Sequence, residues 1–282
     1  ADAVILADGV NSLVTEKARA ALGMKPGATE QDYAVGVKEV IGLSREKIED
    51  RFNLGEKEGV AIDFIGTPFE GLIGGGFLYT GKESLHLGFA AKLESVVKSG
   101  KSPNEIMNGF KKHPVMAKYI RGGELQEYSA HLIPEGGYYA ISQLAANGLM
   151  IAGDAAGFVN MSLYKEGTNL AMESGKCAAE TVIEARKTGD FSQAGLQGYE
   201  KKLNESFLMK DLKKVRRIPK VLEGSPNLMS LYPAKATAML VDFFSVGLEP
   251  KAAIQKKAIL KFLKGLPKYQ FVRDTLRARN LI

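Results

Sequence analysis

The chain has 282 residues, of which 45% are hydrophobic and 25% charged, and its formal net charge is +6. This composition is typical of a globular protein that is long enough to bury one large or two ordinary cores, and it excludes a disordered or fibrous chain. The single cysteine, Cys177, excludes an internal disulfide and an iron–sulfur cluster held by this chain alone. We therefore expect a reducing, cytoplasmic setting.

Patterns of hydrophobic and turn-forming residues predict a mixed α/β chain. The predicted elements are, in order, a strand that ends at Ala7-Asp8-Gly9, a helix over 15–22, a strand over 33–41, a capped helix over 44–52, strands over 59–65, 72–80 and 84–91, a helix from 102 to about 119, strands over 127–133 and 148–154, and a long helix over 167–186. From residue 191 onward we expect helices broken at Pro219, Pro226, Pro233, Pro250 and Pro267.

Basic residues are concentrated in two segments near the C-terminal end. Residues 201–220 contain eight basic and two acidic side chains, and residues 251–282 contain nine basic and one acidic. The hydrophobic stretch 231–248 contains Lys235 and Asp242, so the sequence predicts no membrane-spanning helix. The charge indicates a solvated face, an acidic partner or an anionic surface, and the lack of interleaved aromatic residues argues against nucleic acid.

Metal and serine-nucleophile chemistry are not expected. The three histidines, His86, His113 and His131, lack the spacing of metal ligands, so no metal site is predicted. The chain also lacks the G-x-S-x-G motif of a nucleophilic serine.

The most informative segment is 148–157, which reads GLMIAGDAAG. A short apolar run ends in Gly153-Asp154, and small residues follow. A strand of this kind would place a carboxylate beside a nucleotide, and the small residues would let the backbone come close to it. Asp154 is the one charged residue between Ile141 and Tyr164, and burying it without a partner would be costly. A helix N-cap is the alternative interpretation, because Asp is favoured there.

The start of the chain repeats this pattern, since AVILADGVNSLV at residues 3–14 contains a strand-like run that ends in Asp8-Gly9. A third segment, Gly167-Thr168-Asn169, begins a helix rich in small residues. Together the three segments resemble the second and third fingerprints of FAD-dependent oxidoreductases of the glutathione-reductase-like superfamily. The chain is most similar to FixC-type flavoproteins, akin to electron-transfer-flavoprotein:quinone oxidoreductase, and this resemblance covers nearly all of its residues.

The resemblance implies an FAD site. The residues it assigns to cofactor binding are Asp8, Gly9, Gly153, Asp154, Ala155, Gly157, Gly167, Thr168 and Asn169. Asp154 would accept a hydrogen bond from a ribityl hydroxyl, the helix end at 167–169 would face the pyrimidine edge of the flavin, and the Asp8-Gly9 turn would lie near the pyrophosphate. An ordinary helix cap by Thr168 or Asn169 is the alternative for the third segment.

No catalytic residue is assigned by this comparison. Tyr138, Tyr139 and Tyr164 are candidates to line a quinone or ring pocket, although aromatic residues near a core more often simply pack.

The chain departs from the family because no phosphate-binding G-x-G-x-x-G occurs in it. Its sequence begins where the middle of the family begins, which predicts the C-terminal part of a longer protein. The glycines of 71–76 lie among strand-like residues and are predicted as sheet or bulge glycines. Thr15 stands where aromatic-hydroxylase relatives tend to have Arg, which argues against that branch.

The predicted fold class is α/β, or mixed α+β, with an incomplete Rossmann-like FAD-binding unit, an inserted antiparallel sheet and a helical C-terminal cap. We expect residues 1–30 and 141–190 to belong to the FAD-binding domain, 31–140 to the sheet or substrate domain, and 191–282 to the cap.

The function implied by the resemblance is that of an FAD-dependent oxidoreductase passing electrons from an electron-transfer flavoprotein toward quinone. An iron–sulfur centre would reside on a ferredoxin-like partner, and the basic helices would dock an acidic electron-transfer protein or contact the inner face of a membrane peripherally. Two alternatives are a geranylgeranyl-reductase-like flavoenzyme and a non-catalytic, truncated fragment that acts only as an interaction module and binds FAD weakly.

Overall fold

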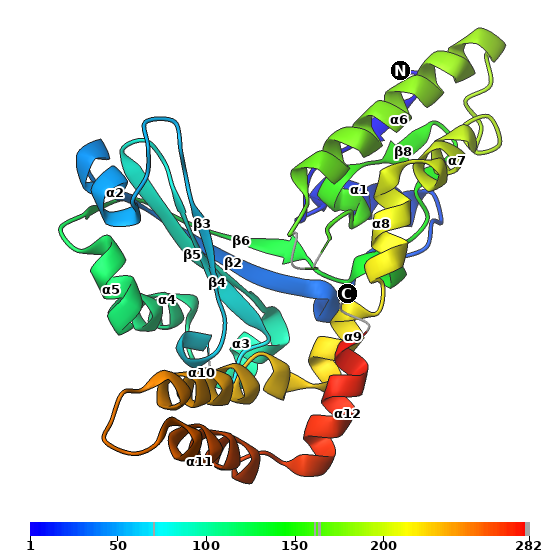
Figure 1. Cartoon of the computed structure of the whole chain (residues 1–282). Helices are drawn as coiled ribbons and strands as arrows, with labels where there is room; N and C mark the ends of the chain where they lie inside the picture. Colours follow the sequence, from blue (N-terminus) through cyan, green and yellow to red (C-terminus); the bar gives the residue numbers. More distant parts are fainter. Residues whose placement is uncertain (70, 161, 163–164, 280–282) are drawn as a thin grey trace. The chain divides into compact units, whose positions relative to one another are not determined.

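The computed structural model describes residues 1–69, 71–160, 162 and 165–279. Contacts divide the chain into two compact units (Figure 1). The first unit contains residues 1–34 and 132–220, and the second contains the described residues of 35–131 and 221–280. The finer division into segments 1–30, 31–140, 141–190 and 191–282 stays a prediction.

The first unit is built on a sheet of order β1-β8-β7. Strand β1 (Val4–Leu6) pairs in parallel with β8 (Leu149–Ile151), and β7 (Ala145–Ala146) pairs with β8 in the antiparallel direction. The helices of this unit are α1 (Leu13–Ala21), α6 (Thr168–Thr188), α7 (Gly198–Glu205) and α8 (Phe207–Val215), with short 3-10 helices η1 (Glu30–Asp32), η3 (Gly137–Ala140) and η4 (Gly153–Ala156). Both strands that the sequence predicts before Asp8 and Asp154 are present, and the structure pairs them in parallel.

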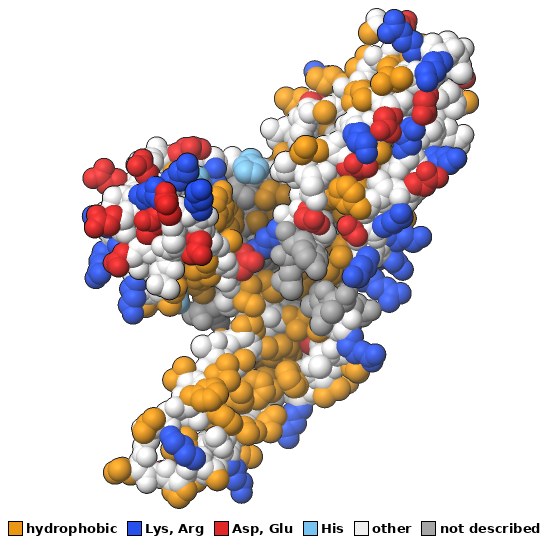
Figure 2. Space-filling model, turned by 45° about the horizontal axis from the view of Figure 1, so that its top comes forward, with side chains coloured by type: hydrophobic (Ala, Val, Ile, Leu, Met, Phe, Trp, Pro, Cys, Tyr) orange, Lys and Arg blue, Asp and Glu red, His pale blue; other side chains and the backbone are white. Residues whose placement is uncertain are grey.

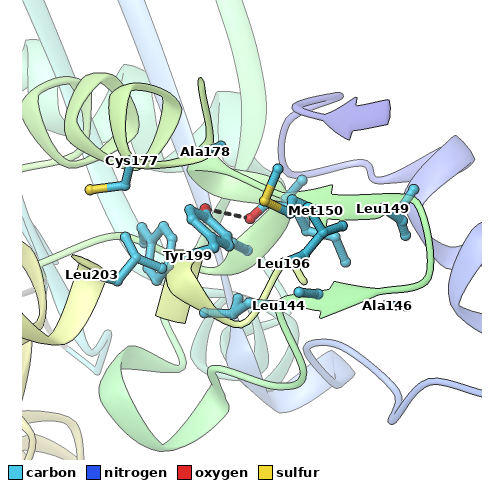
Figure 3. Packing of buried hydrophobic residues seen from close by; sticks show 14 of the residues in the cluster. Leu144, Ala146, Leu149, Met150, Cys177, Ala178, Leu196, Tyr199 and Leu203 are labelled. Atoms are coloured by element: carbon cyan, nitrogen blue, oxygen red, sulfur yellow. Dashed lines mark hydrogen bonds between the residues drawn. The ribbon is translucent and has the colours of Figure 1, made fainter. Parts of the chain in front are cut away.

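The core of the first unit joins β8 to α6 and α7 (Figure 3). Met150 of β8 and Tyr199 of α7 are completely buried, and the small residues Cys177 and Ala178 of α6 pack in the same cluster. The Tyr199 hydroxyl donates a hydrogen bond to the Ile151 backbone oxygen at 2.8 Å, which satisfies the polar end of a buried ring. Burial raises the pKa of Tyr199, so its hydroxyl keeps the proton that this bond needs.

The second unit contains a sheet of order β3-β4-β5-β2-β6. Its strands are β2 (Tyr33–Gly42), β3 (Ala61–Phe64), β4 (Gly74–Thr80), β5 (Ser84–Lys92) and β6 (Glu124–Pro134), of which β2 and β6 continue across the boundary into the first unit. Strand β4 is antiparallel to both β3 and β5. These strands confirm the predicted inserted sheet, and the glycines at 74–76 lie in β4 as expected.

The helices that follow β2 and β5 are α2 (Arg45–Phe52), α3 (Leu93–Ser99), α4 (Pro103–Lys112) and α5 (Pro114–Ile120). Ser102 begins α4 with a capping box, because its hydroxyl accepts from the Glu105 N–H while the Glu105 carboxylate accepts from the Ser102 N–H. The prediction of one helix from 102 to 119 is wrong. The chain turns at His113, and Pro114, which lacks an N–H, begins a new helix.

The remaining helices of the second unit are α9 (Ile218–Gly224), which begins in the first unit, η5 (Pro226–Leu228), α10 (Leu231–Phe244), α11 (Lys251–Lys264) and α12 (Lys268–Ala278). Prolines mark the starts of these helices rather than breaks inside them. Pro219 and Pro233 lie in the first turns of α9 and α10, where the missing N–H has no intrahelical partner to lose. Within the described ranges, every helix is too short or too polar to cross a bilayer.

Candidate functional site

Two turns come together at the carboxyl ends of β1 and β8. Leu6 lies opposite Ile151 in the parallel pair, and the Ala152 N–H donates to the Leu6 oxygen at 2.9 Å. The turn after β1 contains Asp8 and Gly9, and the turn after β8 is η4. Both turns therefore lie at the edge of the sheet where open α/β sheets bind their ligands.

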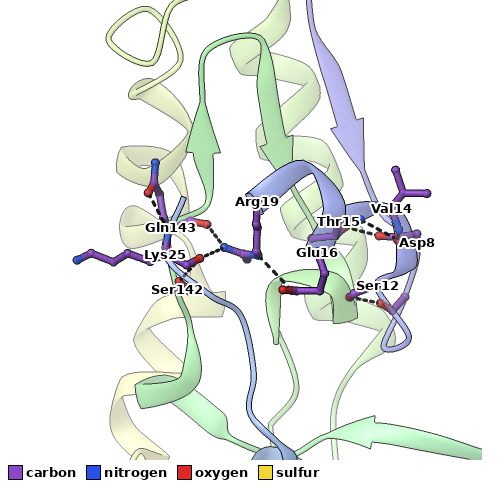
Figure 4. Close-up of polar contacts among 10 residues, drawn as sticks. Asp8, Ser12, Val14, Thr15, Glu16, Arg19, Lys25, Ser142 and Gln143 are labelled. Carbon is purple, nitrogen blue, oxygen red and sulfur yellow. Dashed lines mark hydrogen bonds and ion pairs between the residues drawn. The ribbon is translucent and has the colours of Figure 1, made fainter. Parts of the chain in front are cut away.

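The Asp8 carboxylate binds the first turn of α1 (Figure 4). Its Oδ2 accepts from the N–H groups of Val14 at 2.8 Å and Thr15 at 3.1 Å, and its Oδ1 accepts from the Thr15 hydroxyl. Partial burial raises the pKa of Asp8, but these hydrogen bonds outweigh it and hold the pKa below its ordinary value. The helix α1 begins at Leu13, with Ser12 at the N-cap position, and not at the predicted residue 15, and Asp8 satisfies two N–H groups of its first turn.

The accessible part of the first turn is its backbone. Gly9 has φ of 75°, and a Cβ added there would meet no atom within 4 Å. Ser12 holds the turn closed, since its hydroxyl donates to the Gly9 oxygen at 2.8 Å. A ligand can therefore approach the peptide at Gly9 more closely than it could approach a residue with a side chain.

The second turn requires glycine at two positions. φ is 64° at Gly153 and 79° at Gly157, a region that disfavours residues with a Cβ. The Gly153 N–H donates to the Ser174 hydroxyl of α6 at 2.9 Å, which fixes the turn against that helix. Asp154 is half-buried, whereas the neighbouring Ala155 is buried.

The loop before α6 is closed by the Glu166 carboxylate. Its Oε2 accepts from the Asn160 side-chain amide at 2.8 Å, and its Oε1 accepts from the Asn169 amide at 2.9 Å. The Asn169 side chain is thus turned toward Glu166, while Gly167 stands at the N-cap position without a side chain to cap the helix. Thr168 is exposed. The predicted ring-pocket residue Tyr164 lies outside the described residues.

A pocket of the first unit joins the two turns, and its empty volume is about 320 Å³ with the open solvent at its mouth included. Its lining combines both turns with α1 and the segments near 27 and 140, namely Val10, Ser12, Glu16, Arg19, Gly27, Ala28, Tyr33, Pro134, Ala140, Ser142, Asp154, Ala155, Ala156 and Gly157. Of the predicted site residues, Asp154, Ala155 and Gly157 line this pocket. Asp8 and Gly9 precede its lining residue Val10, and 167–169 are not among the described lining residues.

Arg19 is the main residue of this pocket that the sequence did not indicate. Its side chain is buried, with 2% of the residue exposed, and one terminal nitrogen donates to the Lys25 oxygen at 3.0 Å and the Gln143 oxygen at 2.9 Å. Its Nε lies 3.5 Å from Glu16 Oε1. Burial lowers the pKa of Arg19, and the charge of Glu16 acts in the opposite direction. Arg19 therefore ties α1 to two other segments that form the pocket wall (Figure 4).

Two family models match separate parts of the chain. Residues 33–133 match the model described as ETF-QO, ubiquinone-binding, and residues 218–281 match the ETF-QO/FixC family C-terminal domain. The chain belongs to the ETF-QO/FixC family. This result confirms the resemblance to FixC-type flavoproteins.

Relatives within the ETF-QO/FixC family align along the whole chain. It is 42% identical over 283 residues to the "Probable electron transfer flavoprotein-quinone oxidoreductase YdiS" of Escherichia coli (strain K12), and 40% identical over 284 residues to Protein FixC of the same strain. Protein FixC of Azotobacter vinelandii is 43% identical over 272 residues, or 94% of this chain. The chain spans 62–65% of the length of these three relatives.

Solved structures confirm the predicted α/β fold class. A geranylgeranyl bacteriochlorophyll reductase-like protein from Thermoplasma acidophilum has a TM-score of 0.60 at 17% identity, covering 100% of this chain and 62% of its own. The flavin-dependent brominase Bmp2 has a TM-score of 0.57 at 14% identity, covering 94% of this chain and 64% of its own. At these identities the similarity extends to the fold alone.

Proposed function

We propose that the full-length protein to which this chain belongs is an FAD-dependent oxidoreductase that passes electrons from an electron-transfer flavoprotein toward quinone. The observation that carries this proposal is the pocket where the turns after β1 and β8 meet. The match of 33–133 to a ubiquinone-binding model supports quinone as the acceptor. The name of the YdiS relative supports the electron-transfer flavoprotein as the donor.

The residues of the pocket fit FAD. The open space beside Gly9 and Gly157 leaves room for the pyrophosphate and the ribityl chain against backbone N–H groups. Asp154 would accept a hydrogen bond from a ribityl hydroxyl, and the helix end at 167–169 would place positive potential near the flavin ring. When bound, FAD supplies the redox chemistry, and these residues bind and orient it.

A site variant tests this assignment in the full-length protein. A charge-assisted hydrogen bond contributes about 1.5–3 kcal/mol, so Asp154→Ala should weaken FAD binding by about tenfold or more in equilibrium dialysis. Asp190→Ala, an exposed carboxylate of the same unit, should leave FAD affinity unchanged. Purified full-length protein without flavin absorbance, or equal affinities for wild type and Asp154→Ala, would contradict the proposal.

The remaining partners are a ferredoxin-like protein carrying the iron–sulfur centre and, for a cytoplasmic protein, the inner face of the membrane. Membrane contact is supported by the turn between α10 and α11, where Phe244, Val246 and Leu248 are 72%, 91% and 108% exposed. Figure 2 shows hydrophobic side chains gathered over these two helices. Exposed lysines of α11 accompany them, namely Lys251, Lys256, Lys257, Lys261 and Lys264. An apolar tip with basic flanks is typical of interfacial membrane binding.

Vesicle sedimentation tests the membrane contact. The full-length protein should bind phosphatidylglycerol vesicles more strongly than phosphatidylcholine vesicles, and Phe244→Ser with Val246→Ser should abolish most of that binding. Val97→Ser removes an apolar side chain of α3 that is about as exposed as Phe244, and it should not change vesicle binding. Unchanged binding of the double variant would exclude the α10–α11 turn as the contact.

A further inference from the structure

A second basic surface lies on the first unit, along α7, α8 and the start of α9. It consists of six exposed side chains, which we call the basic ridge: Lys201, Lys210, Lys213, Lys214, Arg217 and Lys220. The same stretch of chain, residues 198–220, contributes three acidic residues, Glu200, Glu205 and Asp211. Figure 2 shows Lys and Arg side chains gathered where α7 and α8 face the viewer.

The ridge is held in place by the packing of α8. Leu208 and Leu212 on the opposite face of this helix are completely or almost completely buried, so Lys213 and Lys214 are directed outward. Among the described contacts, neither lysine pairs with a carboxylate. In contrast, Lys202 of α7 lies 2.9 Å from Glu184 and 3.8 Å from Glu180 of α6, so its charge is neutralised within the unit.

The ridge borders the end of the proposed flavin turn. A second pocket of the first unit is lined by Leu212, Val215 and Arg216 of the α8 segment on one side and by Val159 on another. Val159 follows Gly157 of the turn by two residues. One helix and a narrow pocket therefore separate the basic charges from the place where FAD is proposed to bind.

An aromatic residue adjoins the same surface. Tyr139 of η3 is 60% exposed, and the Lys220 Nζ lies 5.3 Å from the centre of its ring. Tyr138 beside it lines the second pocket. An exposed tyrosine beside a basic side chain is consistent with a protein interface, in which tyrosine and arginine are enriched.

We propose that the basic ridge docks a redox protein that presents carboxylates around its own redox centre, an inference that rests on the proposed flavin site. Charge complementarity over this surface accelerates encounter and places the partner beside the flavin turn. The ridge lacks the highly exposed apolar tip found between α10 and α11. This difference assigns the ridge to a protein and the α10–α11 turn to lipid.

Charge reversal in the full-length protein tests the docking surface. The variant is Lys213→Glu with Lys214→Glu, and the matched control is Lys112→Glu with Lys118→Glu, two exposed lysines of α4 and α5. The measurement is the stopped-flow rate of flavin reduction by reduced electron-transfer flavoprotein, and separately by reduced ferredoxin, at low and high salt. Reduction by dithionite, a small reductant that needs no docking, is followed in parallel.

We expect the ridge variant to lower the second-order rate with one of these proteins by at least about tenfold at low salt and to flatten its salt dependence. The rates of the Lys112→Glu, Lys118→Glu control and all dithionite rates should be unchanged. Equal rates for wild type and ridge variant with both proteins overturn the docking surface, whether or not the variant also loses binding to phosphatidylglycerol vesicles. Absence of a flavin that dithionite reduces in wild type would instead contradict the proposed function.

Discussion

Single residues at the strand ends have different tasks although their sequence surroundings are similar. Asp8 and Asp154 both follow an apolar strand and both were predicted to contact a cofactor. The Asp8 carboxylate binds the N–H groups of α1, whereas Asp154 lines the pocket. Asp8 thus satisfies helix N–H groups with its carboxylate, although Ser12 and not Asp8 occupies the N-cap position of α1.

The hydrogen bonds of Arg19 predict that this residue stabilises the folded protein. Arg19→Leu would remove the donor of the part-buried Gln143 oxygen and one of two donors to the Lys25 oxygen, which also accepts from the Ser142 hydroxyl. This loss should lower the free energy of unfolding by about 1–3 kcal/mol. Arg186→Leu, at an exposed position on α6, should change it by less than about 0.5 kcal/mol. Urea unfolding measures both values, and equal stabilities of the two variants would contradict the assigned role of Arg19.

The sequence could indicate the Asp8 and Asp154 turns because strand, turn and helix start are local patterns. It could not indicate Arg19, because its acceptor Gln143 is 124 residues away in the chain. The signal available was a basic residue on a short helix, which by itself is typical of a solvated face.

At the level of elements, β4 depends on its glycines for packing. A Cβ added to Gly76 would lie 2.6 Å from the ring of Phe69 and 2.8 Å from the ring of Phe110, which are themselves in contact with 4.9 Å between ring centres. The Phe69 and Phe110 rings that pack on the sheet therefore require glycine at this position.

The break between α4 and α5 at Pro114 was missed although the sequence carries a signal for it, since a proline disfavours helix at the preceding residue.

Two alanine variants separate this packing effect from backbone preference. Gly76→Ala should destabilise the protein by about 1–3 kcal/mol through overpacking. Gly109→Ala on α4, where an added Cβ meets nothing within 4 Å, should be neutral or stabilise by up to about 1 kcal/mol. Thermal unfolding that ranks the two variants in the reverse order would contradict the packing.

The C-terminal helices are joined by the buried carboxylate of Asp274 on α12. It accepts hydrogen bonds from the Ser225 and Tyr232 hydroxyls, both at 2.8 Å, and from Arg273. Burial raises the pKa of Asp274, but the bonds from Tyr232, Arg273 and Ser225 outweigh it and hold the pKa below its ordinary value of 3.8.

This carboxylate therefore stabilises the fold above pH 3.8, and the contribution is lost as the pH falls through the lower folded-state pKa. Asp274→Asn should lower the free energy of unfolding by about 2–4 kcal/mol at neutral pH, and the difference from wild type should shrink in acid. Asp242→Asn, which removes an exposed ion pair with Lys261, should cost less than about 1 kcal/mol. A wild-type advantage that persists unchanged in acid would contradict this account.

At the level of the whole molecule, the chain divides into a unit built on the parallel β1–β8 pair and a unit that contains most of the residues matched by the family model described as ETF-QO, ubiquinone-binding. Alternating hydrophobicity was sufficient to predict the inserted sheet, because strand patterns are local. The assignment of α7 and α8 to the first unit and of α10–α12 to the second could not be predicted, since no local pattern in these helices distinguishes the two groups. The unit to which each helix belongs depends on contacts between residues that are distant in the sequence.

The most direct test of electron transfer from the flavin to quinone is reoxidation of the reduced flavin by quinone. The full-length protein is purified with its flavin, reduced anaerobically with dithionite and mixed with a short-chain ubiquinone, while the flavin absorbance is followed by stopped flow. We predict that the oxidised flavin spectrum recovers and that about one quinone is consumed per flavin, because both are two-electron carriers. A reduced flavin that quinone leaves unchanged, but that an unsaturated polyprenyl substrate reoxidises, would contradict it.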